Sequence, residues 1–349
     1  MRSLQLCASV SPVSRPVAVA GRLVVATAAV LAVLLPVAAA EDGDDDLVWA
    51  VKAPLAPHSL LVDLAAAGSR LVAVGERGHI LLSDDGGASW AQAAVPTRSN
   101  LTGVFFLDGD RGWAVGHDAV VLRTTDGGET WERVYWAPED ESPLFDVWFA
   151  GPDDGFALGA YGMLLVTADG GDTWDYGSLE DVDAHLHRLA QGPDGALFIA
   201  AEAGVLFRSL DDGETWEELP SPYGGSFFGV LPLEEDVLLA YGLRGHLYRS
   251  EDGGESWTEI DSGTTSLLSD GVLLEDGTVI IVGLGGVVMV SRDGGRTFAS
   301  LEPEDRRGIG AVLEGPSGTV VMAGEFGVRT VAVTDLGAAG ATTEGGDGR

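Results

Sequence analysis

One eight-residue pattern, repeated six times, limits what this chain can fold into more than any other feature of its sequence. The pattern is Ser/Thr-x-Asp-x-Gly-x-Ser/Thr-Trp/Phe, which we call the Asp box, and successive copies begin 41 to 43 residues apart. The copies are residues 83–90, 124–131, 167–174, 209–216, 250–257 and 291–298. Four short runs rich in Val, Leu, Ile or Ala accompany each copy, and Gly or Asp bounds them. A period of this length with four strand-like runs is typical of a β-propeller.

A second marker, a Gly-rich corner before the third strand of each unit, gives the number of blades. There are seven corners, at residues 75–78, 116–118, 159–162, 201–204, 242–245, 283–286 and 324–327. The seventh unit stops before a fourth strand. Residues 47–51 resemble the strand that follows each box, with Trp49 in the place of the box aromatic. We therefore predict an all-β, seven-bladed β-propeller with Asp-box turns, whose seventh blade is closed by this N-terminal strand. Such closure would remove two exposed sheet edges.

The composition of the box indicates a structural role. Its Asp can accept hydrogen bonds from nearby backbone N–H groups, its Gly allows a positive φ, and its aromatic ring can pack between sheets. We assign this role to Asp85, Asp126, Asp169, Asp211, Asp252, Asp293, Trp90, Trp131, Trp174, Trp216, Trp257 and Phe298. The alternative is a calcium or catalytic site, but the other ligands of a calcium loop do not recur at fixed spacing. We therefore predict no metal site.

The first 40 residues have the pattern of a secretory signal peptide. Three Arg precede an uncharged run over residues 23–40 that ends in three Ala. An uncleaved membrane anchor is the alternative, because this run is just long enough to span a bilayer. We predict a signal peptide over 1–40, one propeller over 47–334 and a disordered tail over 335–349. The chain would then be exported to the periplasm or another extracytoplasmic (lumenal) face, without its one cysteine, Cys7.

The charge of the chain excludes one class of partner. It has 54 acidic and 20 basic residues, a formal net charge of −34. Nucleic-acid binding needs a basic surface, so we predict no nucleic-acid partner. An acidic surface that maintains solubility, as in a salt-rich source, is one explanation of the charge, and a cationic ligand is another.

No catalytic constellation stands out in the sequence. A sialidase-like glycosidase is the enzyme alternative, but the arginine motif of sialidases has no match, and convergent carboxylates cannot be recognised among so many acids. His185 and His187 could face the same side of a strand as a metal pair, yet no third ligand is identifiable. We predict a protein that is not an enzyme and has no cofactor.

The Gly-rich corners carry the candidate binding residues. Their third positions are Arg77, Asp118, Tyr161, Ala203, Arg244, Gly285 and Phe326, which differ in size and charge from blade to blade. Arg and aromatic side chains dominate protein-binding hot spots. We predict a partner site formed by Arg77, Tyr161, Arg244 and Phe326. Ordinary variation among surface loops is the alternative.

A resemblance to a known family rests on two segments with the same order of motifs. Residues 112–116, Gly-Trp-Ala-Val-Gly, precede the box over 124–131, and 145–149 followed by 155–159 repeat the arrangement. The chain resembles the photosystem II assembly-factor family of exported seven-bladed propellers. The resemblance implies a non-catalytic factor that holds a reaction-centre subunit during assembly, with arginines contacting the partner. We expect a monomer that binds a membrane protein, either such a subunit or, as the alternative, a transporter.

Overall fold

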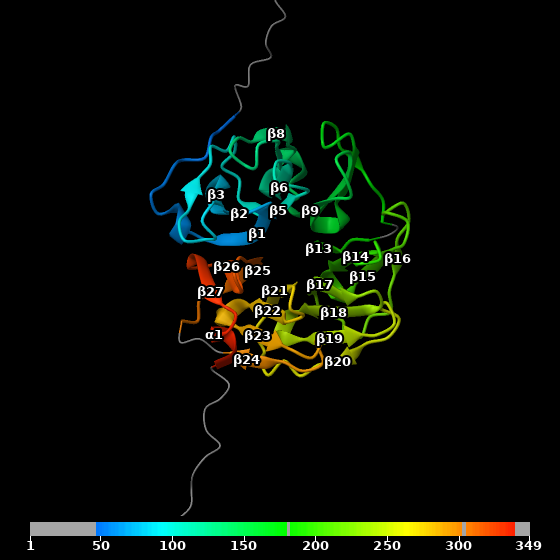
Figure 1. Ribbon diagram of the computed structural model, residues 1–349. Coiled ribbons are helices and arrows are strands. Elements are labelled where there is room, and N and C mark those ends of the chain that lie inside the picture. The colour runs from blue at the N-terminus through cyan, green and yellow to red at the C-terminus, as the bar shows by residue number, and fades with distance from the viewer. Residues whose placement is uncertain (1–46, 180–181, 302–304, 339–349) are drawn as a thin grey trace, which may run out of the picture. The chain divides into compact units, whose positions relative to one another are not determined.

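The computed structural model describes residues 47–179, 182–301 and 305–338, and each repeat within them forms one antiparallel sheet. The sheets follow one another around a ring, with the first strand of each blade nearest the axis (Figure 1). These first strands are β1 (Leu61–Ala67), β5 (Leu101–Phe106), β9 (Leu144–Phe149), β13 (Leu186–Gln191), β17 (Phe227–Glu234), β21 (Leu268–Leu273) and β25 (Ile309–Gly315). β25 also contacts β1, so the ring is closed. The prediction of an all-β propeller with seven blades is confirmed.

The remaining strands lie progressively farther from the axis. The second strands are β2 (Arg70–Gly75), β6 (Gly112–Gly116), β10 (Asp154–Gly159), β14 (Leu197–Ala201), β18 (Val237–Gly242), β22 (Val279–Gly283) and β26 (Thr319–Gly324). The third strands are β3 (Ile80–Ser83), β7 (Val121–Thr124), β11 (Leu164–Ala168), β15 (Leu206–Ser209), β19 (Leu247–Ser250), β23 (Val288–Ser291) and β27 (Gly327–Ala332). The fourth strands are β4 (Ala91–Gln92), β8 (Glu132–Tyr135), β12 (Asp175–Tyr176), β16 (Glu217–Glu218), β20 (Thr258–Glu259) and β24 (Ala299–Leu301).

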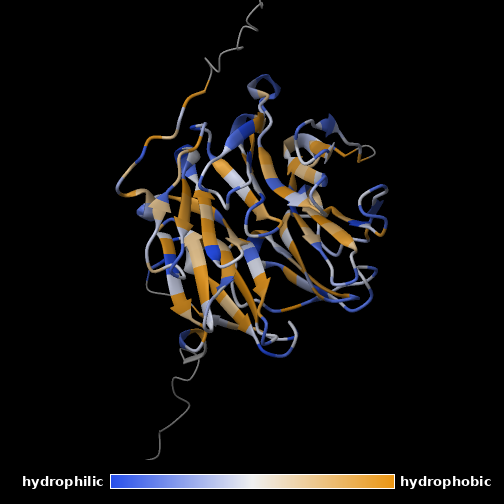
Figure 2. Cartoon of the chain, turned by 45° about the horizontal axis from the view of Figure 1, so that its top comes forward, coloured by the Kyte–Doolittle hydropathy of each residue, from blue (hydrophilic) through white to orange (hydrophobic). Residues whose placement is uncertain are grey.

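The hydrophobic core is divided into layers between neighbouring sheets. Apolar residues concentrate in the strands and hydrophilic residues in the connecting loops (Figure 2). Six of the seven layers contain the aromatic residue that ends an Asp box, as Trp131 does between blades 1 and 2. The layer between blades 6 and 7 instead contains Val333 and Leu336. These two aliphatic residues therefore replace the aromatic that the seventh blade lacks.

Each box is closed by its own hydrogen bonds. In the first box, one oxygen of Asp85 accepts from the Ser83 hydroxyl (2.9 Å) and the Ser89 backbone N–H (2.8 Å), and the other accepts from the Ser89 hydroxyl (2.6 Å). The same three bonds recur in the other five boxes. They favour the ionised carboxylate and lower the pKa of Asp85 to about 2.

The prediction that an N-terminal strand closes blade 7 is wrong. The seventh sheet contains β25, β26 and β27 among the described residues, and the N-terminal segment lies on the outer edge of blade 1. There the Ala50 N–H donates to the Val95 carbonyl at 2.9 Å. The Gln92 side chain accepts from the Ala53 N–H (2.8 Å) and donates to the Val51 carbonyl (3.1 Å). The amide of Gln92 thus fixes the segment on blade 1, one blade beyond the expected position.

The chain enters and leaves the ring through two short helical turns. The 3₁₀ turn η1 (Ala56–His58) contacts both β4 and β27, at the junction of blades 1 and 7. Residues 335–338, predicted as the start of a disordered tail, form α1 (Asp335–Ala338) with Leu336 buried, so that part of the prediction is wrong. The rest of the tail and the predicted signal peptide lie outside the described residues. Within the described ranges, no helix has the length and apolar character needed to cross a bilayer.

Candidate partner-binding face

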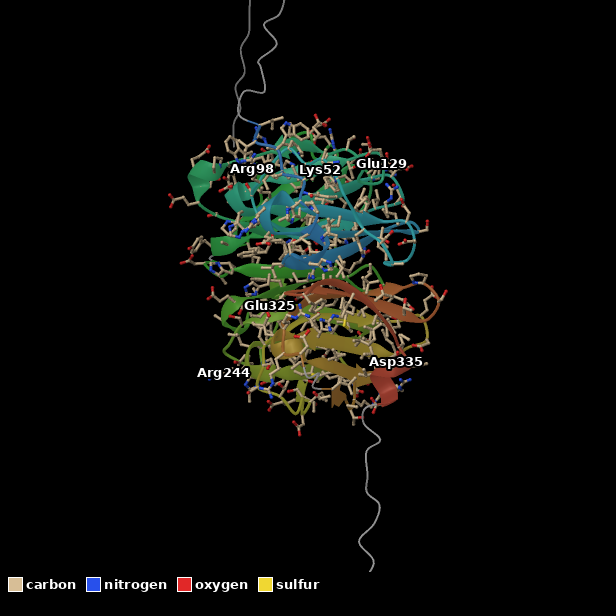
Figure 3. The ribbon with its side chains drawn as sticks, turned by 90° about the vertical axis from the view of Figure 1, so that its left-hand side faces the viewer. Lys52, Arg98, Glu129, Arg244, Glu325 and Asp335 are labelled. Carbon is tan, nitrogen blue, oxygen red and sulfur yellow. The ribbon has the colours of Figure 1, made fainter. Side chains whose placement is uncertain are left out.

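The ring has two faces that differ in construction. The Asp boxes lie on one, which we call the box face. The turns between second and third strands, and the loops that lead to the next blade, lie on the other, which we call the corner face. Figure 3 views the ring from its rim, with Arg244 and Glu325 of the corners on one side and Glu129 of a box on the other.

The corners hold side chains outward on a strained backbone. Six of them form a 3₁₀ turn: η2 (Glu76–Gly78), η3 (His117–Ala119), η5 (Ala160–Gly162), η6 (Glu202–Gly204), η7 (Leu243–Gly245) and η8 (Leu284–Gly286). The middle residue of each is left-handed, with φ between 56° and 72°. This conformation costs a residue other than Gly about 1 kcal/mol. Gly occupies the position in η8 alone, so the Arg and Tyr residues are present despite that cost, as is common at functional sites.

The two predicted corner arginines are free of strong ion pairs. The Arg77 side chain is 76% exposed, and its nearest acid, Glu76, is 3.9 Å away. Arg244 is exposed and makes no ion pair with any described residue. Arg306, in the loop before blade 7, is likewise exposed and unpaired within the described ranges. Their guanidinium donors are therefore available to a partner.

Four arginines of the box face have a different role. Arg70, Arg123 and Arg208 each pair with two acidic side chains and donate to the Gly carbonyl of the neighbouring box at 2.9–3.3 Å. Arg249 repeats the arrangement with Glu251 and the Gly294 carbonyl. These arginines join consecutive blades, so their charge is neutralised within the molecule.

Tyr161 is the exposed end of an aromatic row near the axis. Its side chain is 64% exposed, and its ring meets that of His185 edge-on with centroids 4.9 Å apart. Phe145 contacts both His185 and His187, and His187 stacks on Phe228 at 4.4 Å. The row crosses blades 3, 4 and 5 and contributes aromatic side chains to the corner face.

The histidine pair belongs to this row. The Nδ1 atom of His185 accepts the Tyr161 N–H (3.1 Å), and Nδ1 of His187 donates to the Phe227 carbonyl (2.7 Å). Burial lowers the pKa of His187. Within the described ranges no third His, Cys, Asp or Glu joins them to form a metal-binding group.

Phe326 does not share the surface of the other three predicted residues. Its side chain is 6% exposed, in the layer between blades 6 and 7, with the Arg329 guanidinium 3.5 Å from its ring centroid. The corner of blade 7 is not a 3₁₀ turn, and its left-handed residue is Gly327, with φ 87°. The phenyl ring therefore turns inward where Arg77, Tyr161 and Arg244 point out.

A polar pocket beside Arg244 was not predicted. It has a volume of about 560 Å³. Its lining includes Thr264, Thr265, Ser266, Asp261 and Arg306, and also Gly285, which has no side chain to fill the pocket. The Thr264 carbonyl lies directly against Gly245 of the Arg244 corner. The run of three hydroxyl residues was the signal in the sequence that could have indicated it.

A cluster of charges on the axis was also not predicted. Arg188 of β13 lies 3.2 Å from Asp63, 3.5 Å from Asp146 and 3.3 Å from Asp270, which come from β1, β9 and β21. The second oxygen of each aspartate accepts a backbone N–H of the next blade at 2.8–2.9 Å. Burial raises the pKa of Asp146 and Asp270 to about 6. A charged residue two positions after the first Leu of an apolar strand was the available signal.

The fold and this face define the class of protein. The chain is a seven-bladed β-propeller that carries Asp boxes on one face and a variable surface of arginine, tyrosine and hydroxyl residues on the other.

Sequence comparison places the chain within that class. The family model described as "Photosynthesis system II assembly factor YCF48" matches residues 45–140 and 137–282, and the chain belongs to this family.

Solved structures agree with the fold. "YCF48 bound to D1 peptide" is 19% identical, with a TM-score of 0.66 over 81% of this chain and 95% of the other. "YCF48 from Cyanidioschyzon merolae" is also 19% identical, with a TM-score of 0.67 over 82% and 99%. A streptogramin B lyase, at 15% identity, has a TM-score of 0.67 over 78% and 93%, so the fold also occurs in an enzyme. No curated protein matches the sequence.

Proposed function

We propose that this protein is an exported, non-catalytic factor that binds a segment of a photosystem II subunit on its corner face during assembly. Membership of the YCF48 family supports the process. The printed description of a related structure, with a D1 peptide bound, supports a peptide as the kind of ligand.

The observation that carries the proposed site is the difference in pairing between the box-face arginines that join blades and three exposed arginines of the corner face. Arg77, Arg244 and Arg306 have no strong ion pair among the described residues, although the chain as a whole carries a large excess of acid. A guanidinium binds a carboxylate through two parallel hydrogen bonds. The corner face therefore suits a segment with acidic side chains or a terminal carboxylate, with Tyr161 contacting an apolar residue of that segment.

The test is capture of partner proteins from native membranes by the tagged full chain, followed by mass spectrometry. The double variant Arg77→Ala/Arg244→Ala should recover at least about tenfold less of the photosystem II subunit, since two charge-assisted hydrogen-bonding groups are removed. Arg292→Ala/Arg296→Ala removes two exposed arginines from the box face and should recover a normal amount.

Three outcomes would contradict the proposal. Equal losses in both double variants would mean that the corner face is not the site. Recovery of a transporter in place of photosystem subunits would retain a membrane-protein partner but reject the photosynthetic one. Turnover of a fluorogenic sialidase substrate would reject the non-catalytic assignment. Cell fractionation checks the export, which predicts the protein outside the cytoplasm.

A further inference from the structure

The third strand of blade 7 is far less buried than its six counterparts. In β3, β7, β11, β15, β19 and β23, at least three of the first four residues are buried. In β27 only Gly327 is buried, and Thr330 is exposed. The difference arises because the other six strands have a fourth strand beside them, whereas β27 has none among the described residues.

The outer edge of β27 has backbone groups that pair with no other described residue. β27 pairs with β26 from Gly327 to Ala332, and no other described residue makes a backbone hydrogen bond with residues 328–332. In an antiparallel pair, every second residue directs its N–H and C=O away from its partner. Figure 3, which looks at this side of the ring, shows β27 in red toward the viewer. Such an edge is a template for another strand.

The edge is held firmly from both sides. Val328 packs in the layer between blades 7 and 1, and Val331 in the layer between blades 6 and 7. Leu336 of α1 fills the inter-blade position that a box aromatic occupies elsewhere. The described part of blade 7 is therefore packed with three strands, and an added strand would have to supply only edge pairing.

Arg329 indicates which side chains would suit this edge. Its guanidinium makes one hydrogen bond to a described residue, with Asp305 at 3.2 Å, and that carboxylate is shared with Arg307 at 2.6 Å. The Arg329 side chain is 36% exposed, with most of its five N–H donors unused. On a strand paired with β27, the residue opposite Arg329 would lie about 5 Å away, on the same face.

We propose that the edge of β27 binds an extended segment of a partner protein as the fourth antiparallel strand of blade 7. The six complete blades show the geometry, in which a fourth strand of two to four residues pairs antiparallel to the third. The fitting segment has β-branched residues and an acidic residue opposite Arg329. This surface lies on the rim, so the proposal does not depend on the function of the corner face.

The first test is amide hydrogen exchange of the full chain, alone and with the peptide Thr-Val-Glu-Val-Thr, blocked at both ends. In the free protein, the outward-facing amides of residues 328–332 should exchange at least about tenfold faster than those of β3 or β23. A saturating amount of peptide should slow them by a similar factor. Slow exchange of β27 in the free protein would overturn the proposal, because another part of the chain or a second copy would then cover the edge.

Reversal of the charge at position 329 provides the second test. Arg329→Glu should weaken binding of the Glu peptide by about fivefold and should strengthen binding of a peptide that has Lys in place of Glu. Arg292→Glu on the box face should change the affinity of neither peptide. Equal binding of the two peptides to Arg329→Glu would reject the assigned register. Arg77→Ala/Arg244→Ala should bind the Glu peptide normally. Loss of binding in that variant would place the peptide on the corner face and overturn the rim site, while normal binding leaves the corner-face proposal to its own experiment.

Discussion

The box face and the corner face come from the same seven repeats, yet the arginines that join consecutive blades and the arginines of the corners are paired differently. On the box face, Arg70, Arg123 and Arg208 are tied to acids and to the neighbouring box. On the corner face, Arg77 and Arg244 are exposed and lack such ties among the described residues. A position with a structural role tends to recur in every repeat, whereas a recognition position can differ from one blade to the next. The comparison therefore separates arginines that stabilise the ring from those available to a partner.

The largest effect is expected at the most deeply paired arginine. Arg188→Met would leave Asp63, Asp146 and Asp270 close together on the axis without a cation. Removing one partner of a buried ion pair costs about 3–5 kcal/mol. Urea unfolding should show a loss near 4 kcal/mol at neutral pH, and a smaller loss at pH 5, where the carboxylates take up protons. A loss below 1 kcal/mol at both pH values would mean that the axial cluster does not hold the ring.

Tryptophan offers a similar comparison between a box and a loop. Trp131 is 5% exposed between blades 1 and 2, whereas Trp136 is 40% exposed, with Arg133 over its ring. Trp131→Ala should destabilise the protein by about 3 kcal/mol, because it leaves a large cavity. Trp136→Ala should cost less than 1 kcal/mol. Both are measured by chemical denaturation, and equal losses would contradict the layered core.

The dependence of stability on pH should have opposite signs for the two sets of aspartates. Asp146 and Asp270 have pKa values raised to about 6 by burial, so the folded state binds their protons more tightly than the unfolded state does. Their contribution makes stability increase as pH falls from about 6 to 4, by at most about 3 kcal/mol for each carboxyl. Box residues such as Asp85 and Asp169 have pKa values lowered to about 2, and their contribution is lost as pH falls from about 4 to 2.

Thermal melting across this range should therefore show a maximum near pH 4 to 5. The double variant Asp146→Asn/Asp270→Asn is the control, since it should lose the slope between pH 4 and 6 but retain the fall at lower pH. A wild-type profile with its maximum at pH 7 or above would contradict the raised pKa values.

The smallest expected effect is the difference in stability between two single-arginine variants. Arg208, with its side chain 15% exposed, holds Glu217, Glu255 and the Gly253 carbonyl, so Arg208→Ala should cost about 1 kcal/mol. Arg244→Ala should leave stability unchanged within error, because no contact of its guanidinium within the described ranges is lost. If the two variants have the same melting temperature, the difference in pairing between Arg208 and Arg244 makes no contribution to stability.

The sequence by itself determined the parts of the molecule whose hydrogen bonds join residues only a few positions apart. Each Asp box forms its hydrogen bonds between residues two to four positions apart, so its turn could be predicted from eight letters. The period of the boxes and the seven corners then gave the number of blades. The 3₁₀ corners carry Arg77, Tyr161 and Arg244 as exposed, left-handed residues, and their role in partner binding stays a prediction.

Tertiary structure decided what depends on contacts between distant residues. The N-terminal segment could pair with blade 7 or blade 1, and the side chain of Gln92 placed it on blade 1. The axial cluster joins residues 63, 146, 188 and 270, which become neighbours only when the ring closes. Phe326 turned inward because Gly327 took the left-handed position in its corner. Local hydrogen bonds within a repeat specify each blade. Which sheet edge the N-terminal segment pairs with, and which charged residues meet on the axis, is decided only when the whole ring is closed.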